Sequence, residues 1–271
     1  MFKYRIIDDF LSENDLDISL GLHFGVDFNN HAEGVDFSAA KAKEAIYTFM
    51  PRVAKTISGI EAKVGFNTSI IERFDSTGNI TQFYPYLRVD YAFSDSYQSV
   101  FAGVRGGIRE NSMWSITKEN PYVLNTLNDG DADLKLVNGS VVYDFFAGMR
   151  TKISSSIYFD AGLSYSREEN MPFFELDYSS RLKNKFQVLY DDVNHLELDA
   201  GLKWDFSSNK GIYLDFVYHS YSLDSLATYA YKPTLESSFG VFYKIANKIV
   251  GNAYLKTAFG RSHLANANDG H

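Results

Sequence analysis

The chain contains no cysteine, and this absence excludes several classes of protein. A disulfide-stapled domain, a thiolate metal site and a cysteine nucleophile all require that residue. No apolar run reaches the roughly 18 residues that a membrane-spanning helix needs. The net charge of -8 does not fit a broad basic face, so we expect no nucleic-acid partner.

Proline is scarce as well, with 5 residues in 271, whereas aromatic side chains are abundant. The chain carries 19 tyrosines and 22 phenylalanines, two residue types that favour strands. Hydrophobic residues make up 45% of the sequence, which excludes a disordered chain. The length suits one large all-β domain.

Apolar residues recur at every second position, which is the period of a strand. In 196–206, for example, leucine, alanine, tryptophan and phenylalanine alternate with glutamate, aspartate, glycine and lysine. The predicted strands are 2–10, 16–28, 45–56, 60–70, 83–93, 98–109, 141–153, 157–167, 195–206, 212–219, 235–245 and 249–257.

These strands are long, and the segments between them alternate between short and long. Transmembrane strands need about 9–11 residues, more than the usual globular strand. Short polar turns alternate with longer segments such as 110–140 and 168–194, as in outer-membrane barrels. A soluble β-sandwich also alternates apolar and polar residues and is the rival interpretation. The sequence predicts an all-β, antiparallel, up-and-down transmembrane β-barrel, integral to a bacterial outer membrane.

Charge is confined to one face of the clearest strands, which leaves the other face free to meet lipid. We therefore expect partners in outer-membrane lipid and lipopolysaccharide, and in other outer-membrane proteins. The residues predicted to line the barrel lumen are Arg88, Asp90, Arg105, Arg109, Asp144, Arg150, Lys152, Asp160, Glu197, Asp199 and Lys203.

Several short motifs resemble an outer-membrane β-barrel family of Bacteroidetes that is labelled TonB-dependent-receptor-like. The motifs are Glu119-Asn120-Pro121-Tyr122-Val123, Asn170-Met171-Pro172-Phe173-Phe174, Lys232-Pro233 and the stretch from Asn184 to Val193. The resemblance covers 118–194 and 229–259. It implies a longer protein with a signal peptide and further strands upstream, although neither a signal peptide nor a plug domain is visible here. We therefore expect a C-terminal fragment, with 1–260 forming a barrel incomplete at its N-terminus and 261–271 forming a loop or tail.

Candidate chemistry is sparse. The acidic residues Asp129, Asp131 and Asp133 have the alternate spacing of a calcium loop, but the closing glutamate is missing. A solvated acidic loop and a surface Ca²⁺ site both remain open, and no other cofactor is expected. His219 shares a strand face with Asp215, but the two lie about 13 Å apart along a strand, so no catalytic pair is readable. We expect that the chain is not an enzyme.

Three functions follow from this interpretation. The first is porin-like or TonB-dependent-receptor-like transport of small solutes, with the segments 110–140 and 168–194 shaping the mouth of the barrel. The second is a structural or assembly role, in which the barrel anchors partner proteins and its lumen is filled by side chains. The third, a barrel enzyme, would need an acid, a base and a nucleophile clustered at the rim.

Overall fold

One antiparallel sheet dominates the computed structural model, which describes residues 2–6, 16–29, 41–73, 79–93, 97–123, 137–176, 186–226, 231–245 and 249–261. Within these residues, 12 strands lie side by side in the order in which they occur along the chain. They are β1 (Phe2–Ile6), β2 (Leu16–Asn29), β3 (Lys41–Ile57), β4 (Ile60–Arg73), β5 (Ile80–Ala92), β6 (Ser99–Arg109), β7 (Gly139–Ser154), β8 (Ile157–Leu176), β9 (Phe186–Ser207), β10 (Lys210–Leu223), β11 (Leu235–Ile245) and β12 (Ile249–Phe259).

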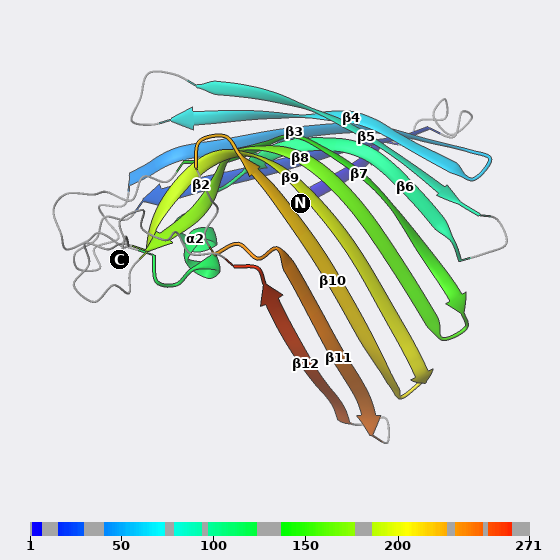
Figure 1. The fold of residues 1–271 in the computed structure, drawn as a ribbon. Coiled ribbons are helices and arrows are strands. Elements are labelled where there is room, and N and C mark those ends of the chain that lie inside the picture. The colour runs from blue at the N-terminus through cyan, green and yellow to red at the C-terminus, as the bar shows by residue number, and fades with distance from the viewer. Residues whose placement is uncertain are drawn as a thin grey trace, which may run out of the picture.

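Every strand pairs antiparallel with the next one, so the predicted all-β, up-and-down architecture is confirmed. The sheet is strongly curved, as Figure 1 shows. Among the described strands, β1 pairs only with β2 and β12 only with β11, so these twelve do not close on themselves. They form an open, trough-like wall.

The prediction that 168–194 forms a loop was wrong, because most of it extends β8 and β9. The pairing between these strands shifts between Glu168 and Met171, where Asn170 has a φ of 51°. Beyond this bulge, the residues from Met171 to Phe174 are all buried. A run that is buried on both faces has no period of two, so alternation could not reveal it. The expected loop 110–140 likewise contains the short helix α2 (Met113–Glu119).

The apolar face of the sheet is the exposed one. Phe83 on β5 and Phe145 on β7 are 64% and 54% exposed. On the opposite face, polar side chains lean over neighbouring strands: the Asp199 carboxylate occupies the space that a Cβ of Gly162 would need, and Asp160 does the same at Gly201. A soluble sheet buries its apolar face, whereas this sheet presents that face to its surroundings.

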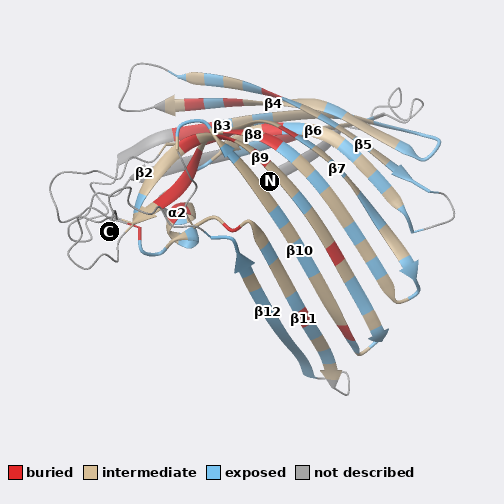
Figure 2. Ribbon diagram, in the orientation of Figure 1, coloured by how far each residue is buried: buried red, intermediate tan, exposed pale blue. Residues whose placement is uncertain are grey.

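The buried apolar clusters gather at one end of the sheet, where β8 and β9 extend beyond their neighbours and meet α2 (Figure 2). One cluster joins Ile116 of α2 to Val123 and Phe174. A second joins Met171, Phe173 and Val193. Among the described residues, no helix has the length and apolarity to span a bilayer.

Candidate functional site

The eleven residues predicted to line the lumen all lie on the polar face of β5 to β9, and several form close ion pairs. Arg88 donates two hydrogen bonds to Asp90, both of 2.7 Å. The Arg105 Nε donates to Asp144 Oδ2 at 2.7 Å, which joins β6 to β7. The remaining members of the set are Arg109, Arg150, Lys152, Asp160, Glu197, Asp199 and Lys203.

Five cations of this set lie over aromatic rings: Arg88, Arg105, Arg150, Lys152 and Lys203. The Arg150 guanidinium lies 5.2 Å from the ring centre of Phe101, and the Lys152 ammonium lies 4.6 Å from that of Tyr97. The predicted calcium ligands Asp129, Asp131 and Asp133 lie outside the described residues. The polar face is therefore lined by charges of both signs, with aromatic rings between them.

The outward face of β8 to β10 changes from apolar to polar at one level. Tyr165, Leu196 and Tyr218 are its last apolar residues, and we call the apolar stretch that ends there the outer band. The next outward residue on β8 is Arg167, which forms two hydrogen bonds with Asp224, of 2.9 and 2.5 Å. This hydrogen bonding lowers the pKa of the Asp224 carboxyl, which lies just after β10.

Beyond this level, the buried Asp191 carboxylate holds the segment that follows β10. It accepts hydrogen bonds from the backbone N–H groups of Ser225 and Leu226 at 3.0 and 2.9 Å. Burial alone would raise the pKa of Asp191, but these hydrogen bonds outweigh burial and lower it. Because the folded state holds the ionised form, stability from Asp191 is present above the usual carboxyl pKa of 3.8 and is lost as the pH falls through the lowered value.

Replacing Asp191 by asparagine should therefore loosen the segment after β10 without unfolding the sheet. The charge-assisted hydrogen bonds become neutral ones, which are roughly half as strong. We expect faster amide hydrogen exchange at Ser225 and Leu226 in the variant at pH 7, and a smaller difference from the wild type near pH 2. An unchanged exchange rate at pH 7 would show that the carboxylate does not order this segment.

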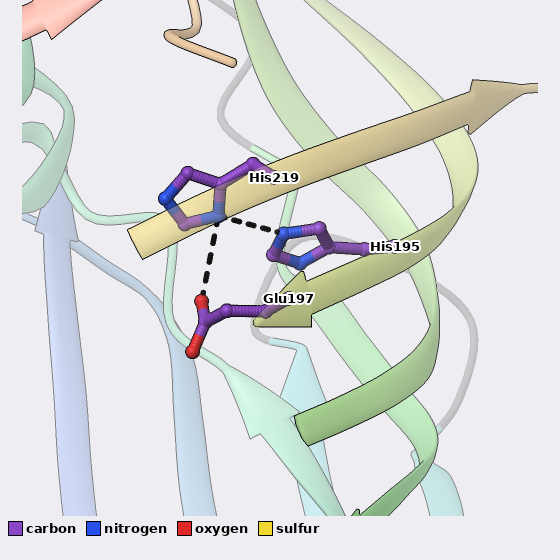
Figure 3. Close-up of side chains that lie close together, drawn as sticks. All are labelled: His195, Glu197 and His219. Carbon is purple, nitrogen blue, oxygen red and sulfur yellow. Dashed lines mark hydrogen bonds and ion pairs between the residues drawn. The ribbon is translucent and has the colours of Figure 1, made fainter. Parts of the chain in front are cut away.

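Two histidines and a glutamate meet on the polar face, close to the level at which the outer band ends. His195 and Glu197 come from β9 and His219 from β10, where His219 is the register partner of Glu197. The His195 Nε2 lies 3.1 Å from His219 Nδ1, and the latter lies 3.5 Å from Glu197 Oε2 (Figure 3). One ligand atom from each residue falls within 4.8 Å of the others, so the three side chains converge on one point.

Side chains from β6, β8 and β10 surround the His195 imidazole. Its Nδ1 lies 3.2 Å from Oε1 of the buried Glu168, which also accepts a hydrogen bond from Ser166. The Arg109 guanidinium forms an ion pair of 2.5 Å with the same carboxylate. The ring of Tyr221 stacks on the His195 imidazole, with 4.5 Å between the ring centres. These contacts orient the imidazole, so that its Nε2 points towards His219.

An open hollow of about 310 Å³ adjoins the cluster. Its lining includes Arg105, Arg109, Asp144 and Glu197 of the predicted set, together with His195. A solute in this hollow would meet guanidinium, carboxylate and imidazole groups on the same wall.

The sequence predicted Glu197 to line the lumen. It did not predict a site for His195, and it did not predict that His219 lies close to either residue. The signal was available: His195 and Glu197 are two positions apart and therefore share a strand face. Extending the register straight from the pair Ser207 and Lys210 would have placed His219 opposite Leu198, because a shift between Lys210 and Gly211 moves the pairing by one residue. Asp215, the residue considered beside His219, instead accepts a hydrogen bond from Ser238 at 2.8 Å.

Comparison with known proteins identifies the fold. No family model matches the chain, and no curated protein matches it. Among solved structures, it is similar to the copper transporter OprC, with a TM-score of 0.56, 12% identity and coverage of 90% of this chain and 40% of that one. The FrpB iron transporter from Neisseria meningitidis gives a TM-score of 0.55, 7% identity and coverage of 91% and 40%. The ferripyoverdine receptor of the outer membrane of Pseudomonas aeruginosa gives 0.51, 11% identity and coverage of 89% and 35%.

The shared fold is that of barrels found in outer-membrane receptors and transporters, which agrees with the predicted fold class. These structures are named as transporters and receptors. The chain covers less than half the length of each of them.

Proposed function

We propose that this chain forms part of the wall of an outer-membrane β-barrel that transports a small solute, in the manner of TonB-dependent receptors. One observation carries the proposal: the sheet exposes its apolar face and directs its charges to the other. The outer band continues onto the outward faces of β5 to β7, β11 and β12, and over β5 to β12 it holds no Asp, Glu, Lys or Arg among the described residues. Aromatic side chains gather towards the turn ends of this face, including Tyr91, Phe93, Trp204 and Phe206.

The outer band meets the acyl chains of the bilayer, because an apolar surface of this extent is unfavourable in water. Lipid is therefore the first partner that we propose, with the lipopolysaccharide of the outer leaflet beside the polar residues beyond the band. Further outer-membrane proteins would contact the segments that extend past it.

The edges of the sheet support a larger barrel. Unpaired backbone N–H and C=O groups cost several kcal/mol each in hydrocarbon, so open sheet edges do not occur there. The outer edges of β1 and β12, which have no partner among the described strands, therefore need one, either further strands of the same protein or those of another chain. A 22-stranded barrel of the outer-membrane transporter type would supply them.

The charged residues of the polar face support a role in transport. Arg105 and Arg109 on β6 adjoin the hollow, and Arg150 lies on the same face of β7. Cations at these positions would favour an anionic solute or an anionic metal chelate along this part of the wall. The segments that extend β8 and β9 would form one side of the mouth.

Reconstitution of the intact protein tests the proposal in two stages. Integration is measured first, by extraction of proteoliposomes with alkaline carbonate and by heat-modifiable mobility on gels. Conductance in planar bilayers or uptake of anionic solutes is measured next, for the wild type and for Arg150→Gln. We expect integration, together with anion selectivity that falls in the variant.

Loss of the protein from the membrane on carbonate treatment would overturn the whole proposal. Stable integration without conductance or uptake would overturn transport alone, and would favour the anchoring role in which side chains fill the lumen.

A further inference from the structure

We propose that His195, Glu197 and His219 bind one divalent first-row transition-metal ion on the polar face of the sheet. The inference goes beyond the proposed function and stands on side-chain geometry, so it can fail while the membrane barrel stands. His195 and Glu197 lie on one face of β9, and His219 lies beside them on β10 (Figure 3).

The spacing of the donor atoms fits a coordination polyhedron. Metal bonds of roughly 2.0–2.2 Å place neighbouring ligand atoms about 3.0–3.5 Å apart at octahedral or tetrahedral angles. The distances found are 3.1 Å between His195 Nε2 and His219 Nδ1, and 3.5 Å between His219 Nδ1 and Glu197 Oε2. The third pair lies within 4.8 Å, a gap that rotation of the carboxylate would close.

The surroundings of the two imidazoles give independent support. A metal-bound histidine usually donates its other ring N–H to a carboxylate, which fixes the tautomer and leaves the ligand nitrogen with its lone pair. At His195 that partner is Glu168, 3.2 Å from Nδ1 and itself held by Arg109. At His219 the carboxylate on that side is Glu236, whose Oε1 lies 4.0 Å from Nε2, an ion-pair contact without a direct hydrogen bond. Both rings therefore have a carboxylate on the side away from the proposed ion.

The donor set selects the class of ion. Two imidazoles and one carboxylate suit Zn²⁺, Ni²⁺, Cu²⁺ and Fe²⁺, whereas Ca²⁺ and Mg²⁺ prefer oxygen alone. Three protein ligands leave at least one coordination position, and the hollow lined by His195 and Glu197 gives it room for water or for part of a solute. This open position is typical of sites that exchange their ligands rather than of closed structural sites.

Titration of the intact, metal-free protein in detergent with Zn²⁺ tests the site by calorimetry, with Co²⁺ absorption as a spectroscopic reporter. We expect one ion per chain. Glu197→Gln, which keeps the shape of the side chain, and His219→Asn should each weaken binding at least tenfold. Glu168→Gln replaces the carboxylate that faces His195 Nδ1 by a neutral amide, a weaker acceptor, and should weaken binding by about 10–100-fold.

His23→Asn is the matched control, because His23 lies on β2 and contacts Glu110 at 2.9 Å, outside the cluster. It should bind Zn²⁺ as the wild type does. Heat-modifiable mobility establishes that each variant is folded, and Glu197→Gln keeps the test intact if His219→Asn does not fold. Equal affinity in all variants, or no measurable binding by the wild type, would overturn the site. Membrane integration, measured separately, would remain unaffected by either result.

Discussion

Replacing Leu202 by arginine is expected to lower the free energy of unfolding in a bilayer by about 2–4 kcal/mol. Leu202 lies near the middle of the outer band on β9, between Phe159 of β8 and Leu214 of β10. A guanidinium at this position would be far from water on either side of the membrane. The measurement is urea unfolding from liposomes, followed by tryptophan fluorescence.

Ser222→Arg supplies the matched control. Ser222 is also on the outward face, on the neighbouring strand β10, but it lies beyond the outer band, beside Asn194. The same charge should change the free energy of unfolding little there. If the two variants were equally stable, the outer band would not face lipid. That result would favour the interpretation of the chain as a soluble β-sandwich.

Replacing Phe173 by alanine is expected to cost about 3–5 kcal/mol, the usual range for a buried phenylalanine. Its side chain is 1% exposed and packs with Met171 and Val193 in the extension of β8 and β9. The loss should be local, because the cluster lies beyond the outer band. We expect faster proteolysis and hydrogen exchange in the extension, while carbonate-resistant membrane integration persists.

Tyr122→Ala provides the comparison, since Tyr122 belongs to the same end of the molecule but is 65% exposed. Its removal leaves no cavity and should change proteolysis little. Equal sensitivity of the two variants would mean that the extension does not depend on a packed core.

Alternation predicted most of the sheet, because one face of each strand differs in chemistry from the other. Even the turn between β9 and β10 follows from the polar residues near Ser207 and Lys210. The prediction weakened where both faces are buried, as in Met171 to Phe174, and where a bulge shifts the register. Local pattern also could not show that the described strands form an open wall, since closure depends on the relative positions of β1 and β12.

The candidate site was predicted only in part, for a related reason. Glu197 was placed on the correct face by alternation, but a site made of two strands requires their register as well as their faces. Spacing places His195 on the same face of β9 as Glu197, but its contacts with Glu168 of β8 and Tyr221 of β10 cross between strands and depend on the register. Spacing within one strand shows to which face of the sheet a side chain points. Whether side chains of two strands meet depends on the register between those strands.

The neighbour-to-neighbour order of the strands also constrains how such a protein can change during evolution. Because each strand pairs with the next one along the chain, a hairpin of two strands is a unit that can be duplicated or deleted. The strands that follow would keep their direction, and their turns would stay on the same side of the membrane. Loss of a single strand before β8 would reverse every later one and carry the extension of β8 and β9 to the opposite side of the membrane. Barrels of this kind should therefore differ from their relatives by even numbers of strands.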